Sequence, residues 1–261
     1  MPDLRYHVIS LISVFLALAI GVLLGTAMAD RGVISDQLQN EVTNIQNQLD
    51  QQRELIAERD ARISTMQESV QGMSEAMISD ELQGTSVALV YGPWADEEVA
   101  RNLQSTLSEA GADLTSVEQF PAPSPNEVTG PDETDTQLLY TNLAADVLNV
   151  SGSPNAPEVV VFLGGGDPPQ EVPNGLVDLL TSAERAMFEV WLENGIRVVA
   201  AETSDTARSE VPLFQDVGVT SVDNVDQAAG KAAVVRLADS FQDGSYGIKP
   251  TASDAFPPAS G

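Results

Sequence analysis

Val159-Val160-Val161-Phe162-Leu163-Gly164-Gly165-Gly166 joins five consecutive apolar residues to three glycines. The apolar run has the length of a strand and is rich in β-branched residues. A strand with one face in water alternates apolar and polar residues, so an unbroken run predicts a strand buried on both faces. Val87 to Tyr91 has the same form, Ile196 to Ala201 is apolar apart from Arg197, and a weaker strand is expected at Asp113 to Val117.

Helical patterns lie between and after these strands, over Asp96 to Ala110, Thr134 to Leu148, Ala183 to Asn194 and Gln227 to Phe241. Buried strands that alternate with helices predict an α/β fold, with a mostly parallel sheet covered on both faces. We therefore expect an α/β domain over residues 84–244. Residues 245–261 are rich in Gly, Pro and Ser, which predicts a flexible tail.

The first 30 residues are predicted to form a membrane anchor. Val8 to Ala29 is a run of 22 uncharged residues that would span roughly 33 Å as a helix, enough to cross a bilayer core. Ala27-Met28-Ala29 has the small-x-small form of a signal-peptide cleavage site, but the run is longer than the roughly 7–15 apolar residues of a signal peptide. This favours an uncleaved transmembrane helix over residues 8–29, with the rest of the chain extracytoplasmic.

Small side chains recur at every fourth position of this helix, at Ser13, Ala17, Gly21, Gly25 and Ala29. Such a row allows two helix backbones to approach closely, and Gly21 to Gly25 is a G-x-x-x-G pair. Gly and Ala are also common in membrane helices generally, so the row by itself leaves both interpretations open.

Residues 31–83 are predicted to form a coiled-coil stalk, because apolar residues recur with a heptad period. The a positions are Val42, Leu49, Ile56, Ile63, Val70 and Met77, and the d positions are Leu38, Ile45, Gln52, Arg59, Met66 and Met73. The predicted seam core is Leu38, Val42, Ile45, Leu49, Ile56, Ile63, Met66 and Val70. β-branched residues at a favour two parallel strands, so a parallel homodimer is expected. The alternative is a single amphipathic helix packed on its own chain.

Charge and composition exclude several functions. The chain has 39 Asp and Glu against 12 Lys and Arg, a net charge of −27, with one His and no Cys. A nucleic-acid partner is excluded because such binders need clustered basic residues. One His and no Cys exclude thiolate nucleophiles and any two-His metal site within one chain. The excess of carboxylates over Lys is typical of a surface adapted to high salt.

Three groups of residues are weak candidates for binding. Gly164-Gly165-Gly166 follows a strand at the edge where α/β sheets bind ligands, but it lacks the Lys and Ser/Thr of a phosphate-binding loop. Asp223 and Asp226 could ligate a metal, although helix capping suits Asp226 better. Met66, Met73 and Met77 carry thioethers suited to Cu(I), although all three fall on the heptad seam. None of these forms an active site or a cofactor site, so we expect the protein not to be an enzyme.

Several motifs resemble those of one actinobacterial family. They are Arg5 to Leu11, Val14 to Gly21 with Gly25, Asp80 to Val87, Val222 to Asp226 with Gly230, and Gly244 to Gly247. Together they resemble the mycobacterial copper transport protein B (MctB) family. The resemblance implies a cell-envelope protein of copper homeostasis that acts as a copper efflux channel in the outer membrane, and it is the only indication of copper.

The residues themselves favour a second hypothesis. A membrane anchor, a dimeric stalk and an extracytoplasmic α/β domain suit a non-catalytic scaffold that recruits or regulates a cell-wall or cell-division partner. The sequence therefore supports two hypotheses: a copper-efflux component and an envelope scaffold.

Overall fold

The computed structural model describes residues 4–122, 133–149, 156–166, 168 and 174–258. The chain divides into two compact units, one ending at Met66 and the other beginning at Gln67. We describe each unit by itself.

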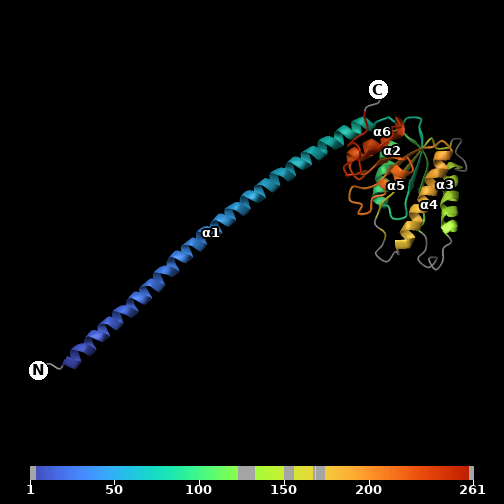
Figure 1. The fold of residues 1–261 in the computed structure, drawn as a ribbon. Coiled ribbons are helices and arrows are strands. Elements are labelled where there is room, and N and C mark those ends of the chain that lie inside the picture. Colours follow the sequence, from blue (N-terminus) through green and yellow to red (C-terminus); the bar gives the residue numbers. More distant parts are fainter. Residues whose placement is uncertain (1–3, 123–132, 150–155, 167, 169–173, 259–261) are drawn as a thin grey trace. The chain divides into compact units, whose positions relative to one another are not determined.

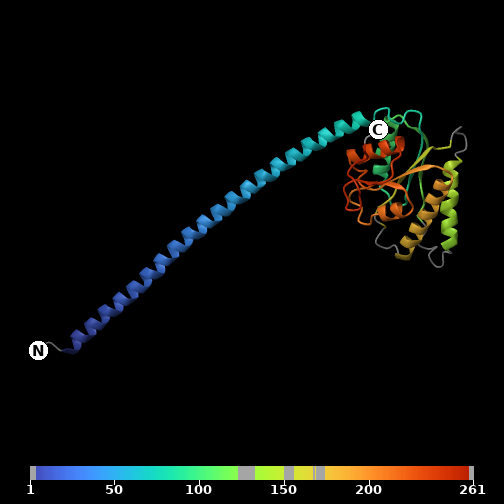
Figure 2. The same ribbon diagram turned by 45° about the horizontal axis from the view of Figure 1, so that its top comes forward.

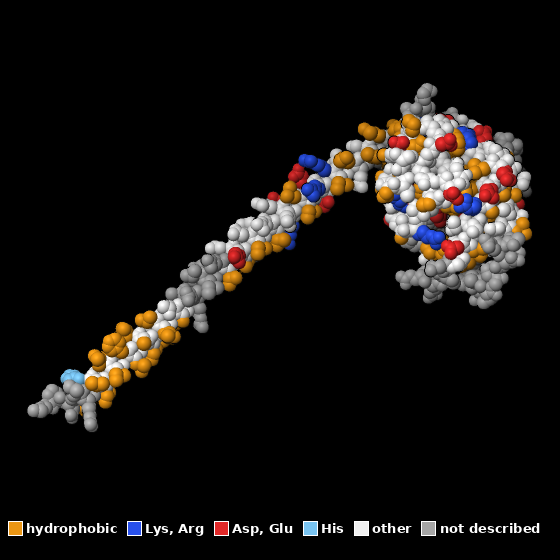
Figure 3. All heavy atoms as spheres, viewed as in Figure 1, with side chains coloured by type: hydrophobic (Ala, Val, Ile, Leu, Met, Phe, Trp, Pro, Cys, Tyr) orange, Lys and Arg blue, Asp and Glu red, His pale blue; other side chains and the backbone are white. Residues whose placement is uncertain are grey.

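The first unit is one helix. It forms most of α1, which runs over Leu4–Ile78 and continues into the second unit. Tyr6–Met28 is 23 residues long with a mean hydropathy of 2.7, and its side chains are exposed, as the apolar surface of this part of α1 shows (Figure 3). By length and composition this segment can cross a membrane. The apolar N-terminal helix and the long helix predicted from the sequence are both present.

The predicted heptad seam is also exposed. Its eight apolar core residues lie on α1 and are between 40% and 66% exposed. These eight side chains are therefore only partly covered within the described chain, whereas Ile78 and Leu82, at the end of the predicted stalk, are buried in the core of the second unit.

The second unit contains a sheet of six strands in the order β2-β1-β3-β4-β5-β6, in which every neighbouring pair is parallel. The strands are β1 (Ser86–Tyr91), β2 (Asp113–Gln119), β3 (Val159–Leu163), β4 (Arg197–Ala201), β5 (Thr220–Val222) and β6 (Ser245–Tyr246). The helices are α2 (Glu97–Glu109), α3 (Glu133–Leu148), α4 (Asn174–Glu193), α5 (Val211–Asp216) and α6 (Ala228–Asp239). The predicted parallel α/β domain is confirmed.

Helices cover both faces of the sheet (Figures 1 and 2). On one face, α2, α6 and the end of α1 pack over Val87, Leu89 and Val161. On the other, α3, α4 and α5 pack over Val90 and Phe162. Successive side chains of a strand point to opposite faces, so burial of both faces explains the unbroken apolar runs.

The structure differs from the sequence prediction at three places. α4 begins nine residues before the predicted start at Ala183, and Leu176 and Leu180 in the added part are buried. α5 and β5 were not predicted, because they have only 6 and 3 residues. The sheet also extends beyond the predicted domain boundary at Gly244, since Ser245 and Tyr246 form β6 and are buried. A strand of 2 residues carries no sequence period, and only its pairing with β5 defines it.

Gly230 in the first turn of α6 provides a test of this packing. A Cβ at Gly230 would lie 2.0 Å from the carbonyl oxygen of Asn224, so the helix contacts the β5–α6 loop backbone directly. We expect Gly230→Ala to lower the free energy of unfolding by about 1–3 kcal/mol, although Ala is normally the better helix residue. Urea unfolding of the full chain measures the change.

Gly175 in the first turn of α4 is the matched control, because a Cβ there would have no atom within 4 Å. Gly175→Ala should leave the stability unchanged or slightly raised. Equal effects of the two substitutions would contradict the close approach at Gly230.

Candidate functional site

A crevice lies at the carboxyl edge of the sheet. The chain passes from β1 to β2 on one side and then to β3 on the other, so the strand order reverses between β1 and β3. Doubly wound sheets bind ligands at such a switch point. The crevice has a volume of about 260 Å³ and is lined by Trp94, Ala95, Asp96, Leu163, Gly164, Gly166, Thr203, Asp205 and Thr206.

The first wall of the crevice is the loop between β1 and α2. Asp96 ends this loop as the N-cap of α2, where its Oδ1 accepts the N–H groups of Glu98 at 2.7 Å and Val99 at 3.3 Å. Helix capping thus holds the carboxylate of Asp96 in place beside the crevice.

The floor of the crevice is the glycine run after β3. Gly166 has a φ of 96°, and a Cβ there would lie 1.9 Å from the carbonyl oxygen of Trp94. Only glycine allows the two loops to approach this closely. The described part of the run does not open a helix, so it has no stack of N–H groups for a phosphate.

The opposite wall follows β4. The hydroxyl of Thr203 donates to Oδ1 of Asp205 at 2.7 Å and lies 2.8 Å from the hydroxyl of Thr206. This wall therefore presents a carboxylate and two hydroxyls, and the side chain of Asp205 is exposed.

A buried ion pair anchors the wall from beneath. Glu202 is fully buried and accepts hydrogen bonds from Lys249 Nζ at 2.6 Å, the Ser209 hydroxyl at 2.7 Å and the Glu210 N–H at 2.7 Å. Lys249 Nζ also donates to the carbonyl oxygen of Thr203 at 2.8 Å. Both charges are satisfied inside the protein, which assigns this pair to structure rather than to ligand binding.

Two further carboxyl groups lie in a second, smaller hollow that shares Trp94 and Gly166 with the crevice. Glu210 precedes α5, and its Oε2 accepts the N–H of Gly165 at 2.8 Å. Glu184 on α4 is 5% exposed, and its charge interacts with Glu210 and Arg208. The hollow has a volume of about 10 Å³, and Arg208 also lines it. This is room for about one water molecule.

Burial dominates the protonation of these two acids. It raises the pKa of Glu184 well above its usual range, and the neighbouring Glu210 raises it further. Burial likewise raises the pKa of Glu210 to about 7, against the opposing effect of the Gly165 N–H. The pair therefore retains a proton close to neutral pH.

The helical pattern of α4 could have identified Glu184 as a candidate site residue. Leu180, Ala183, Met187, Phe188 and Trp191 form the buried face of α4, and Glu184 occupies the same face. An acid on an apolar helix face is a candidate site residue. No sequence pattern identifies Glu210 or Trp94 as site residues. Their loops become neighbours only when the sheet has formed.

The structure assigns Asp223 and Asp226 to loop contacts. Asp223 accepts the N–H groups of Ile248 at 2.7 Å and Lys249 at 3.0 Å. Asp226 accepts the N–H of Ser204 at 2.6 Å and its hydroxyl at 2.7 Å. The capping role predicted for Asp226 is wrong, because Gln227 is the N-cap of α6. The described residues contain no group of three or more His, Asp or Glu placed to hold a metal ion.

The remaining predicted residues lie along α1. Met66, Met73 and Met77 are exposed on this helix. In the small-residue row, the Ser13 hydroxyl donates to the carbonyl oxygen of Ile9 at 2.9 Å, and the Cα positions of Gly21 and Gly25 face open space. Ala17 is exposed on the same helix, and the side chain of Ala29 lies outside the described residues.

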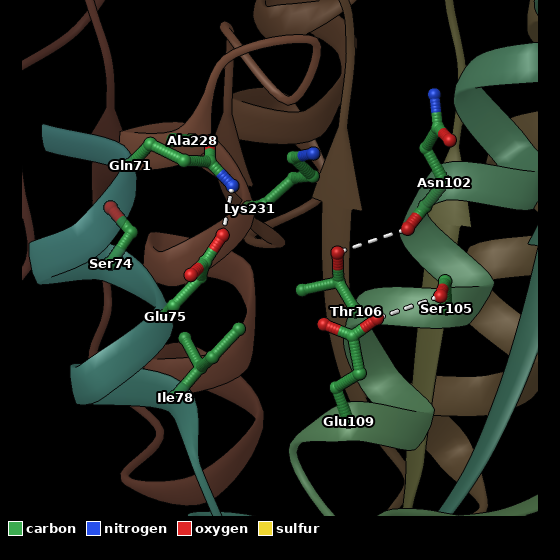
Figure 4. A pocket seen from close by; sticks show the side chains of 10 residues that line it. All are labelled: Gln71, Ser74, Glu75, Ile78, Asn102, Ser105, Thr106, Glu109, Ala228 and Lys231. Carbon is green, nitrogen blue, oxygen red and sulfur yellow. Dashed lines mark hydrogen bonds between the residues drawn. The ribbon is translucent and has the colours of Figure 1, made fainter. Parts of the chain in front are cut away.

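A second groove, of about 210 Å³, lies between the last turns of α1 and α2 and the first turn of α6 (Figure 4). Its polar groups bind one another: the Gln71 amide donates to Glu75 at 2.7 Å, and the Ser105 hydroxyl donates to Glu109 at 2.9 Å. Lys231 of α6 lies between these two pairs in Figure 4. We regard the carboxyl-edge crevice as the better candidate site because it lies at the switch point, beside the smaller hollow that holds the buried acids Glu184 and Glu210.

The raised pKa of Glu210 makes stability depend on pH. Between pH 4.5, the ordinary value, and pH 7, the unfolded chain releases this proton while the folded protein keeps it, so this group's contribution falls as the pH rises. We expect Glu210→Gln to be more stable than the parent at pH 8 by on the order of 1–3 kcal/mol, and the difference to vanish near pH 4. Thermal unfolding of the full chain across this range measures it.

Asp113→Asn is the control, because Asp113 is an exposed acid at the amino end of β2, the opposite edge of the sheet. Its stability curve should run parallel to that of the parent. A Glu210→Gln curve that is also parallel would contradict the raised pKa.

Comparison with known proteins gives partial matches. Residues 1–123 match the family model described as "Copper transport outer membrane protein, MctB". Two curated relatives, each named "Copper transporter MctB", come from Mycobacterium bovis and Mycobacterium tuberculosis. Each is 30% identical over 118 residues, which is 44% of this chain but only 36% of the relative.

Among solved structures, a mutant receiver domain of the histidine kinase CKI1 from Arabidopsis thaliana aligns with 62% of this chain and 95% of its own. The identity is 18% and the TM-score is 0.34.

The closing motifs from Val222 to Gly247 lie outside the family match, which covers the apolar helix, the stalk and the sheet as far as β2. The resemblance to the MctB family predicted from the sequence is thus confirmed through residues 1–123.

Proposed function

We propose that this chain is a membrane-anchored cell-envelope protein of copper homeostasis that acts as a parallel homodimer. The match of residues 1–123 to a family described as copper transport outer membrane protein supports the copper role and the envelope location. The apolar segment Tyr6–Met28 supports the anchor. In this proposal the α/β domain lies on the extracytoplasmic side and the protein is not an enzyme.

The exposed seam carries the dimer proposal. Eight apolar side chains at heptad positions of α1 are 40–66% exposed. Burying a Leu or Ile side chain contributes about 1.5–3 kcal/mol, so a second copy that covers the seam stabilises both stalks. Anchors at the same end of each chain require a parallel pair.

Polar residues in the middle of the seam define how the two copies align. Gln52 and Arg59 occupy d positions and lie on the same face of α1 as Ile56. Polar core residues in a coiled coil lower stability but specify register. The small residues of the membrane segment offer a second contact face, N-terminal to the seam.

An envelope scaffold is the second candidate function. Within the described ranges no three or more His, Asp or Glu side chains are grouped to hold a metal, and the chain has no Cys. A copper carrier would be expected to show such ligands. By contrast, the exposed seam and the crevice are surfaces suited to binding a partner. On this view the dimer holds or regulates a cell-wall or cell-division factor at the membrane.

A single cysteine at Leu49 tests the dimer. Leu49 is an a position, so two parallel copies bring their 49 side chains together across the seam. We expect Leu49→Cys in membranes to form a disulfide-linked dimer on mild oxidation, as measured by non-reducing gel electrophoresis.

Asn47→Cys is the matched control, because this f position points away from the seam. It should crosslink at least about tenfold more slowly. Equal crosslinking at the two positions, or none at Leu49, would count against the parallel pair.

Deletion of the gene separates the two functions. Loss of a copper-efflux component should raise cell-associated copper and sensitise growth to added copper, measured by elemental analysis and growth curves. Normal copper content together with chained or misshapen cells, seen by microscopy, would refute the copper role and support the scaffold.

A further inference from the structure

We propose that Arg59 of each copy pairs with Asp60 of the other across the stalk of the homodimer, and that this pairing sets the register of the two helices. The inference rests on the proposed homodimer and deepens it, because it names the residues through which one copy selects the alignment of the other. Three observations carry it: the heptad positions of the two residues, their unpaired charges, and the residues that a shifted alignment would place opposite Arg59.

Arg59 lies on the seam, and Asp60 lies at its edge. On α1, Arg59 is a d position and Asp60 is the e position that follows it. In a parallel coiled coil each d side chain enters a hole between four residues of the facing helix, namely the a, d and e residues of the same heptad and the next a residue. For Arg59 these residues of the second copy are Ile56, Arg59, Asp60 and Ile63. Asp60 is the single acid among these four, so it is the group that can neutralise Arg59.

Arg59 has no acidic neighbour on its own helix. Helical side chains meet at separations of three and four residues. At these separations from Arg59 the chain has Leu55, Ile56, Arg62 and Ile63. Arg59 is exposed, and it makes no ion pair within the part of the chain that the structure describes. Its charge is therefore available to a second chain.

Asp60 has no basic neighbour on the helix either. The residues three and four positions away from it are Ile56, Ala57, Ile63 and Ser64. Arg59 is adjacent in sequence, but residues at i and i+1 do not face each other on a helix. Asp60 is exposed and, among the described residues, is without an ion pair. The carboxylate is therefore as available as the guanidinium.

The other two stalk arginines whose side chains the structure describes are paired within the helix. Arg53 Nη1 donates to Asp50 at 3.4 Å, and Arg62 Nη2 donates to Glu58 at 3.1 Å. An unpaired arginine at a d position is costly in a coiled coil, because dimerisation moves its charge away from water. A carboxylate from the second copy offsets this cost, and two-fold symmetry places one such pair on each side of the seam.

A shifted alignment loses the pair. If one helix slides by one heptad in one direction, the e residue opposite Arg59 is Gln67, which carries no charge. If it slides by one heptad in the other direction, that residue is Arg53, a like charge. Apolar seam residues discriminate weakly between these alignments, because hydrophobic contact is non-directional. The charges at positions 59 and 60 therefore favour one register and oppose the others.

The experiment uses the full-length Leu49→Cys chain in membranes. The natural chain has no Cys, so the rate of disulfide formation on mild oxidation reports on pairing at position 49 alone. Two charge reversals, Arg59→Asp and Asp60→Arg, are each added to this chain, and each places like charges opposite one another. We expect each to slow crosslinking at least about tenfold, because fewer copies are paired in register.

Combining Arg59→Asp with Asp60→Arg exchanges the two charges. An inter-chain pair of opposite sign can then form again, so crosslinking should recover toward the rate of the Leu49→Cys parent. Salt of about 1 M should also narrow the gap between each single reversal and the parent, because it screens the repulsion. A purely steric role of either side chain would give neither recovery.

Glu54→Arg is the matched control. It changes the charge by the same amount as Asp60→Arg, but position 54 is an exposed f position on the outer face of the stalk. It should crosslink like the parent.

The outcomes separate the pairing from the dimer itself. A Leu49→Cys parent that does not crosslink would contradict the homodimer, and the pairing with it. A parent that crosslinks while both single reversals crosslink at the same rate would overturn the pairing alone. An exchanged-charge variant that stays as slow as the single reversals would also overturn the pairing.

Discussion

Burial of both faces of the central strands is the constraint on which the rest of the second unit depends. Every residue of β3 is buried, with helices packed on each side of the sheet. A polar side chain within such a strand would be buried, at a large cost in desolvation free energy. The polar groups that can bind a ligand therefore lie at the carboxyl ends of the strands and in the loops that follow them. Asp96, Gly164 and Glu202 are examples.

Charges that do enter the interior are paired by a distant part of the chain. Glu202 at the end of β4 binds Lys249, and Asp223 after β5 binds the N–H groups of Ile248 and Lys249. The segment after β6 thus serves as a counter-charge for the carboxyl edge. Glu184 stands apart, because its charge is opposed by burial and by Glu210 in the smaller hollow beside the crevice.

The apolar side chains of the first unit also need cover from water, but its own chain does not bury them. Its apolar residues are exposed in the single chain, first over Tyr6–Met28 and then along the heptad seam. A bilayer covers the first set, and a second copy of the helix covers the second in our proposal. Both functions considered for the protein use this anchored stalk, and they differ in what the α/β domain binds.

The sequence by itself determined the long elements. β3 was predicted at its observed bounds, because burial of both faces leaves an unbroken apolar run. α2 and α3 were predicted within a few residues from their helical pattern, and the apolar helix from its length and lack of charge. The family resemblance through residue 123 was also readable from motifs. Only the tertiary structure decided β5, β6 and the crevice. Thr220–Val222 and Ser245–Tyr246 are too short to show a period, and Trp94, Glu184 and Glu210, far apart along the chain, become neighbours only because parallel strands place their carboxyl ends at one edge.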